Sequence, residues 1–180
     1  MKKTPLFVYA FAVVMALAAS SLAQEPPANP LSGGQKAIYG IVSAALIDGA
    51  EKMPEENYSF KPTPEVRSFG QLVGHAANAQ YLFCSVAAGE KNPSTANIEE
   101  TKTSKADLVQ ALKDGVSYCS KVYAAMTDAQ AIQIVKFFGR DMAKLTVLSF
   151  NSAHADEHYG NMVTYLRLKG IVPPTSEPKK

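Results

Sequence analysis

Three histidines are the residues of this 180-residue chain that most clearly predict chemistry. His154 and His158 are four positions apart, so on a helix both rings leave the same face, one turn apart. A helix uses this spacing to give two imidazole ligands to one metal ion. His75 lies in another amphipathic stretch, and all three rings are expected to face the interior of a helical bundle or its edge. The sequence therefore predicts one metal site that uses every histidine of the chain.

Packing is the alternative interpretation of these histidines, because a lone histidine on an apolar helix face is more often a hydrogen-bonded interior residue than a ligand. A tri-histidine site with an open fourth position suits zinc, and it also suits nickel or iron(II). We therefore expect one divalent metal ion, and zinc is the first expectation. The open position would hold a water molecule or a substrate thiolate.

Glu157 is the candidate catalytic residue of this segment. It lies a helical step of about −100° from His158 and about −60° from His154, so its carboxylate could act as a base beside the metal. The alternative is a solvated acid on the helix flank. The segment also matches the H-x-x-E-H motif of inverted zinc proteases, in which the glutamate activates water. Those proteases need a further glutamate ligand downstream, and Glu177 is the only acid after His158.

Four stretches show the three- and four-residue apolar spacing of amphipathic helices. They are residues 34–53, residues 69–88, a helix that Ser104 can cap, and residues 141–169. Ser68 and Gln71 predict a capping box for the second stretch. Four helices and no clear strand predict an all-α fold, a four-helix bundle that spans residues 34–174.

The connections between these helices are less regular. Residues 54–67 hold three prolines and are predicted as a long connection, and residues 90–103 are polar and predicted as a loop. Thr127 is a possible helix cap. Residues 132–138 are predicted as either a short strand or irregular structure.

The first 23 residues resemble a secretory signal peptide. Lys2 and Lys3 precede an apolar run, and Ser21-Leu22-Ala23 has the small-residue pattern of a cleavage site. A membrane anchor is the alternative, but the run is shorter than the roughly 20 residues that a spanning helix needs. We therefore expect an exported protein, periplasmic or extracellular, without membrane association after cleavage. It would have a flexible leader at residues 24–33 and a polar tail at residues 175–180.

The charge of the cleaved chain argues against nucleic acid as a partner. Without Lys2 and Lys3, 16 basic residues remain against 16 acidic ones. Nucleic-acid binding needs an excess of positive charge that displaces counterions. We therefore expect no nucleic-acid partner.

Cys84 and Cys119 are predicted to form a disulfide, because export removes the usual reductants. The bond would close a loop of about 35 residues and contribute ~3–4 kcal/mol to stability. The alternative is two buried thiols that act as small apolar residues. Cys84 follows His75 by nine positions, about half a turn net, so it is not expected to bind the metal.

Three segments of the sequence resemble the DinB superfamily, over residues from about 37 to 174. They are SFGQLVGH (68–75), HADEHYGN (154–161) and YLRLKGIVPP (165–174). The resemblance implies a four-helix bundle of unusual connectivity, commonly a homodimer. It also implies a divalent metal bound by one histidine of the second helix and two of the last, which in this chain are His75, His154 and His158.

The resemblance further implies a metal-dependent enzyme that acts on a small molecule. The best understood members are transferases that use low-molecular-weight thiols, and a hydrolase is the other expectation. Many relatives have His and Arg at the positions of Glu157 and Tyr159, so the substrate preference of this chain is expected to differ. The alternative from another class is a non-catalytic bundle that the metal stabilises, and an H-x-x-E-H protease is the third hypothesis.

Overall fold

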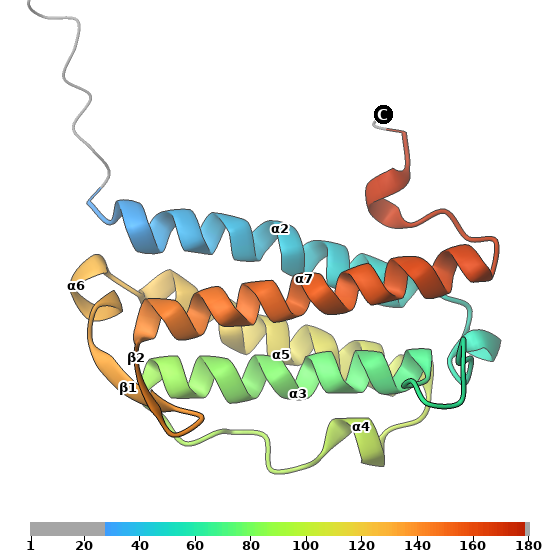
Figure 1. Ribbon diagram of the computed structural model, residues 1–180, viewed down its shortest axis with the longest axis horizontal. Coiled ribbons are helices and arrows are strands. Elements are labelled where there is room, and N and C mark those ends of the chain that lie inside the picture. The colour runs from blue at the N-terminus through green and yellow to red at the C-terminus, as the bar shows by residue number, and fades with distance from the viewer. Residues whose placement is uncertain (1–27, 179–180) are drawn as a thin grey trace, which may run out of the picture.

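The computed structural model describes residues 28–178. The predicted signal peptide and the first part of the predicted leader lie outside these residues. Four long helices form the body of the molecule (Figure 1): α2 (Pro30–Lys52), α3 (Phe69–Ala88), α5 (Lys105–Ala125) and α7 (Lys144–Leu168). The shorter elements are η1 (Glu55–Asn57), α4 (Ile98–Thr101), α6 (Asp128–Ala131), β1 (Ile134–Phe137), β2 (Arg140–Ala143) and η2 (Pro174–Ser176). The predicted four-helix bundle is confirmed.

The connectivity of the bundle places α2 diagonally opposite α3, and α5 diagonally opposite α7. Helix α7 packs against α2 and α3, and α5 packs against the same two helices. Helices α2 and α7 run in one direction, and α3 and α5 run in the other (Figure 1). Helix α3 therefore lies beside α7, which follows it by more than fifty residues, and this pairing brings the predicted metal ligands together.

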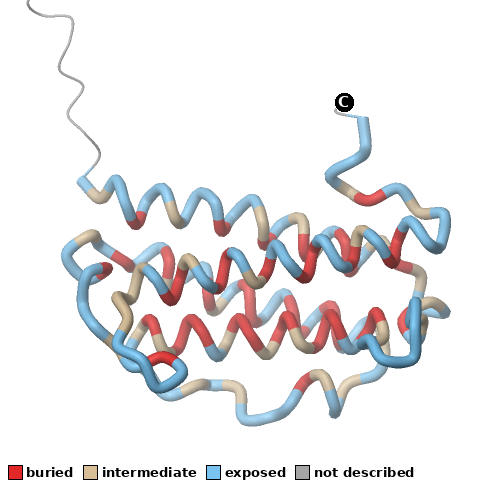
Figure 2. The backbone as a smooth tube through the Cα atoms, in the orientation of Figure 1, coloured by how far each residue is buried: buried red, intermediate tan, exposed pale blue. Residues whose placement is uncertain are grey.

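The core follows the predicted helical periodicity. The inward face of each long helix is buried along its length (Figure 2). The largest fully buried side chains of the core include Tyr39, Leu46, Phe69, Leu112 and Leu166. The predicted capping box begins α3, since the Ser68 hydroxyl accepts a hydrogen bond from the Gln71 amide and the Gln71 side chain accepts one from the Ser68 amide. Within the described part of the chain, no helix has the length and apolar character required to cross a membrane.

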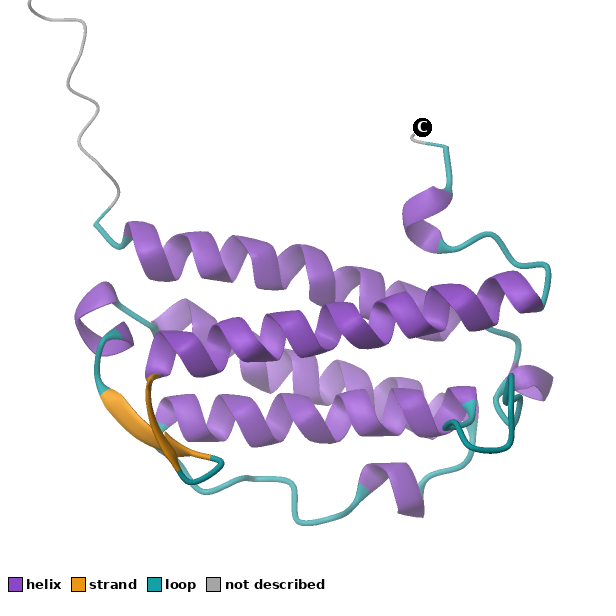
Figure 3. Ribbon diagram, in the orientation of Figure 1, coloured by secondary structure: helices purple, strands orange, loops and turns teal. Residues whose placement is uncertain are grey.

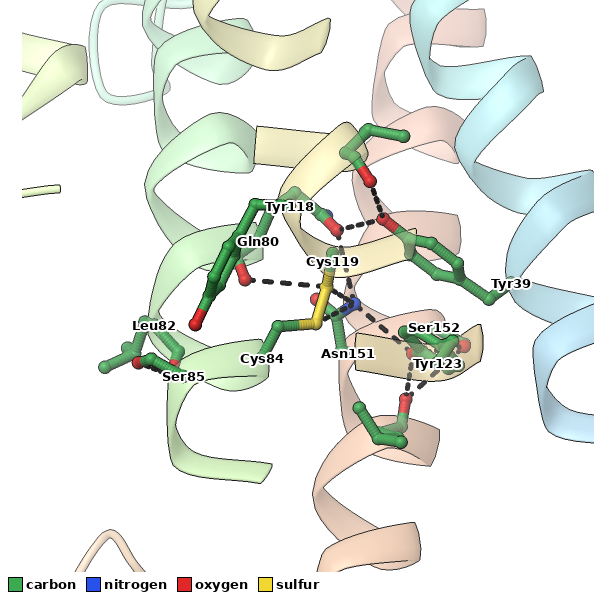
Figure 4. The surroundings of a disulfide bond; sticks show 12 residues. Tyr39, Gln80, Leu82, Cys84, Ser85, Tyr118, Cys119, Tyr123, Asn151 and Ser152 are labelled. Carbon is green, nitrogen blue, oxygen red and sulfur yellow. Dashed lines mark hydrogen bonds between the residues drawn. A yellow bond between two sulfur atoms is a disulfide. The ribbon is translucent and has the colours of Figure 1, made fainter. Parts of the chain in front are cut away.

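The predicted disulfide joins Cys84 of α3 to Cys119 of α5, with 5.3 Å between the two Cα atoms. The other two helices reach the same point (Figure 4). The Asn151 side-chain amide of α7 lies 3.3 Å from the Cys119 sulfur and 3.2 Å from Gln80 Oε1. Tyr39 of α2 donates to the same Gln80 oxygen at 2.8 Å. The disulfide therefore lies at a contact of all four long helices, and the prediction is confirmed.

The leader predicted at residues 24–33 is too long, because α2 already begins at Pro30. The Asp128 carboxylate accepts hydrogen bonds from the backbone amides of Leu31, at 3.1 Å, and Ser32, at 2.8 Å. These amides have no partner within their own helix, so a residue distant in the sequence caps α2. A local pattern cannot reveal such a cap.

The last helix begins at Lys144, three residues later than predicted, because residues 140–143 form strand β2. This strand pairs antiparallel with β1 at one end of the bundle (Figure 3). Phe138 and Gly139 form the two-residue turn with φ values of 46° and 76°, the positive values that a type I′ turn requires. For phenylalanine this backbone conformation costs about 1–2 kcal/mol.

The loop predicted at residues 90–103 contains the short helix α4, which packs on α3. A Cβ atom at Gly74 would lie 2.7 Å from the Glu99 Cα, so only glycine permits this approach. Asn78 adds hydrogen bonds, since its Oδ1 accepts from the Ile98 amide at 2.9 Å and its Nδ2 donates to Asn97 Oδ1 at 2.7 Å. These contacts fix the position of Glu99.

The polar tail is predicted at residues 175–180, and its described part, residues 175–178, contacts the bundle. Thr175 Oγ1 lies 2.7 Å from the Tyr159 hydroxyl, and Glu177 forms an ion pair with Lys52 of α2. Glu177, the downstream acid that the protease hypothesis requires, is therefore not one of the residues that meet at the histidines.

Candidate metal centre

Helices α3 and α7 bring the three histidines together. One ring nitrogen of each of His75, His154 and His158 lies within 4.8 Å of those of the other two. His75 comes from α3, and the other two come from successive turns of α7. The ring centroid of His75 lies 5.3 Å from that of His154 and 4.9 Å from that of His158. The predicted convergence of the histidines is confirmed.

The separation of the two α7 imidazoles fits a shared metal ion. His154 Nε2 and His158 Nε2 lie 3.1 Å apart. Two nitrogens bound at ~2.0–2.1 Å to one tetrahedral zinc ion are about 3.3 Å apart, close to this separation. The Nδ1 atoms of both rings are buried without a hydrogen-bond partner in the described structure. These Nδ1 atoms are not the nitrogens that meet at 3.1 Å, so an ion bound at Nε2 would leave them without a partner.

The site favours the neutral imidazoles that metal binding requires. Burial, then the charges of His154, His75 and Arg67, lower the pKa of His158 to about 3. Burial and the His75 charge also lower the pKa of His154, while the Glu157 carboxylate acts in the opposite direction. At neutral pH both rings of α7 therefore carry free lone pairs, the form that binds a metal ion.

Glu99 is a residue of the candidate site that the sequence did not reveal. Its Oε2 lies 3.0 Å from His75 Nδ1, and its Oε1 accepts a hydrogen bond from Arg67 Nε at 2.8 Å. A carboxylate in this place selects the tautomer with the proton on Nδ1 and leaves Nε2 free for a metal ion. Glu99 belongs to α4, in a segment whose sequence is typical of a polar loop. The pattern offered no signal to distinguish it from its neighbour Glu100.

Glu157, the predicted catalytic residue, lies on the outer side of α7. Its side chain is exposed, and it supplies none of the donor atoms that converge with the histidines. Its negative charge is still felt at the site, where it raises the pKa of His154 against the larger effect of burial. The role of Glu157 as a base stays a prediction.

The histidines are open to two surface hollows. One, of about 600 Å³, is lined by His75 and His154, and the other, of about 590 Å³, is lined by His158. Arg67 and Glu99 border both hollows. The Arg67 backbone oxygen accepts a hydrogen bond from the Tyr165 hydroxyl at 2.7 Å, which holds this arginine beside the site. A third cavity, of about 390 Å³ between α3 and α5, includes none of the histidines.

The fold and the histidines together define a helical bundle with a histidine triad that could hold a metal ion, and comparison with known proteins assigns its family. Residues 42–162 match the DinB superfamily, and the chain belongs to this superfamily. The predicted resemblance is thereby confirmed.

Individual relatives agree with this assignment. The uncharacterized protein YjoA of Bacillus subtilis (strain 168) is 30% identical over 125 residues, which are 67% of this chain and 79% of YjoA. A crystal structure of a DinB-like protein from Bacillus cereus ATCC 10987 is similar with a TM-score of 0.70 at 19% identity, over 79% of this chain and 95% of that one. The crystal structure of the DinB-like protein YjoA gives a TM-score of 0.64 at 23% identity, over 81% and 99%. These two structural similarities show the fold.

Proposed function

We propose that this protein binds one divalent metal ion through His75, His154 and His158 and acts as a metal-dependent enzyme on a small molecule. The observation that carries the proposal is the convergence of three imidazole nitrogens within 4.8 Å, at a place open to two hollows. Three histidine ligands leave at least one coordination position for water or substrate. Zinc is the expected ion, and nickel or iron(II) would suit the same ligands.

The residues of the site have separate tasks in this proposal. A bound ion would supply Lewis acidity, which lowers the pKa of a coordinated water or thiol. The neutral rings of His154 and His158 offer lone pairs, and Glu99 holds the Nδ1 proton of His75 so that Nε2 faces the same point. Arg67 lines both hollows and pairs with Glu99 through Nε, so its guanidinium is held where it could donate to an anionic substrate group.

Two reactions fit this arrangement, transfer to a thiol and hydrolysis by water. Glu157 is our proposed base for the second, since it is exposed and near enough to influence His154. The non-catalytic alternative needs a protein ligand in the fourth position. Glu99, the carboxylate that contacts the triad, already pairs with His75 and Arg67. Because Glu99 is occupied by these two contacts, we expect the fourth coordination position to stay open for water or substrate, as in a catalytic site.

Export is part of the proposal, and the disulfide supports it. A buried Cys84–Cys119 bond is typical of oxidising compartments outside the cytosol. We expect the protein recovered from a periplasmic or culture fraction to begin at Gln24, which mass spectrometry of the intact protein would show. An N-terminus at Met1 in that fraction would contradict cleavage at the predicted site.

Metal content and ligand exchange test the proposal. Purified protein should hold about one divalent ion, and a His154→Ala, His158→Ala variant should lose it. Asn161→Ala is the matched control, because Asn161 lies on the same helix and lines a hollow without joining the triad. In cobalt-loaded protein, an added small thiol should change the visible absorption. Equal metal content in wild type and double variant would contradict metal binding, and an unchanged spectrum would favour the non-catalytic alternative.

A further inference from the structure

Four phenylalanines form a cluster that is continuous with the metal centre. Phe83 of α3 contacts Phe137 of the hairpin and Phe150 of α7, each with 5.4 Å between ring centroids. The Phe83 ring also meets the His154 ring edge to face at 5.2 Å. Phe138 extends the cluster outward, 4.2 Å from Phe137. An unbroken row of aromatic rings therefore leads from the hairpin tip to a predicted metal ligand.

The outer half of this cluster is not explained by packing. Phe83 and Phe137 are each 3% exposed, but Phe150 is 45% exposed and Phe138 is 69% exposed. Phe138 also has a φ of 46°, and it is the one non-glycine residue with positive φ in the described part of the chain. Asparagine or glycine would form this turn without strain. A strained backbone that presents an apolar ring to solvent indicates a role outside folding.

The exposed Phe138 ring forms part of the wall of the hollow of about 600 Å³. Phe138 lines it together with Ala79, Leu82 and Phe83, and His75 and His154 line it as well. The segment 92–97 forms a polar border and is held by the hydrogen bonds of Asn78 to Asn97 and Ile98. Most of the lining residues are polar or charged, so the hollow combines one apolar wall with a polar border. This combination suits a small organic molecule with an apolar end and a polar end.

We infer that this hollow, the aromatic pocket (His75, Ala79, Leu82, Phe83, Phe138 and His154), binds the ring-containing apolar part of a small molecule whose other end binds the metal. Phe138 is its specificity-determining residue. The inference deepens the proposed function and rests on it, because the metal supplies the second anchor. The ligand ring contacts the Phe138 face or edge, and its metal-binding group reaches the histidines that line the same hollow.

Two hydroxamates test the pocket, because they share a metal-binding group and differ in the phenyl or methyl group attached to it. Calorimetry with zinc-loaded protein should show benzohydroxamate binding about tenfold more tightly than acetohydroxamate, as expected when one ring is buried. In Phe138→Asn this preference should fall to within about twofold, while the affinity for acetohydroxamate stays unchanged. Asparagine suits the type I′ turn, so this variant should also melt at a higher temperature than wild type.

Ile132→Asn is the matched control, because Ile132 is as exposed as Phe138, lies on the same connection and does not line the pocket. It should keep the preference for benzohydroxamate. If acetohydroxamate fails to bind the metal-loaded wild type, the proposed open coordination position is contradicted. The pocket inference, which rests on it, is then contradicted as well. If acetohydroxamate binds but benzohydroxamate binds no better, or if Phe138→Asn keeps the preference, the inference alone is overturned.

Discussion

Glu99 Oε2 lies 3.0 Å from His75 Nδ1, so a carboxylate from α4 orients a predicted metal ligand on α3. Carboxylates of this kind fix the tautomer of a ligating histidine and make the ring a better donor. Arg67 holds the other oxygen of the same carboxylate at 2.8 Å. The orientation of His75 thus depends on a short helix that contributes no predicted metal ligand itself.

Replacement of Glu99 should weaken metal binding while the fold survives. In Glu99→Gln the histidine loses its charged partner, and the affinity for zinc should fall by about 10–100-fold. Glu100→Gln is the matched control, since Glu100 is the adjacent, exposed acid of α4. Competition with a chromophoric chelator measures both affinities. Equal affinities in the two variants would contradict a positioning role for Glu99.

The local features of this chain could be predicted from its sequence. Apolar periodicity located the four long helices, and the pair of Ser68 and Gln71 located the start of α3. The spacing of His154 and His158 placed both rings on one helical face. Each of these features depends on residues within about two helical turns, where side-chain chemistry and helix geometry determine the outcome.

The features that the sequence did not reveal depend on distant contacts. Helix α2 begins early because Asp128, 97 residues after Leu31, caps it. The last helix begins late because the residues before Lys144 pair with β1. Glu99 reaches the site because α4 packs against Gly74. None of these partners can be identified from spacing along the chain.

Loss of the disulfide should destabilise the protein without changing the metal site. The chain between Cys84 and Cys119 forms a loop of about 35 residues, so a Cys84→Ala, Cys119→Ala variant should lose about 3–4 kcal/mol of unfolding free energy in urea. Zinc affinity should stay within about twofold of wild type, because neither sulfur belongs to the triad. Two thiols that react in unfolded, unreduced wild type would contradict the bond.

Metal-free protein should lose stability as the pH falls below about 6.5, the ordinary pKa of histidine. Burial and neighbouring positive charges lower the pKa of His158 to about 3 and also lower that of His154. Between the two pKa values the unfolded chain binds protons that the folded chain does not, so acid favours unfolding. Urea unfolding at about pH 7.5 and at about pH 5, on either side of the ordinary histidine pKa, measures this loss.

A His154→Gln, His158→Gln variant is the control for this pH dependence. It retains every carboxylate of the chain but lacks the two rings whose pKa values are lowered. Its unfolding free energy should therefore fall less between the two pH values than that of metal-free wild type. An identical pH dependence in both proteins would show that the two rings are not held neutral by the fold.

Gly74 connects the packing of α4 to the chemistry of the site. A Cβ atom there would lie 2.7 Å from the Glu99 Cα and 3.0 Å from the Glu99 amide nitrogen. Because these are backbone atoms, α4 must move, and the carboxylate then withdraws from His75. Gly74→Ala should thus lose about 1–3 kcal/mol of stability through overpacking and bind zinc about tenfold more weakly, as Glu99→Gln does.

Gly160→Ala provides the comparison for this last prediction. Gly160 is also within a long helix, near the end of the histidine segment, but a Cβ atom there meets nothing within 4 Å. Alanine should therefore stabilise the helix by about 0.5–1 kcal/mol and leave zinc binding unchanged. A Gly74→Ala, Glu99→Gln double variant should bind zinc no more weakly than Glu99→Gln alone, because both changes remove the same contact. Additive losses in the double variant would show that Gly74 acts on the site by a route other than Glu99.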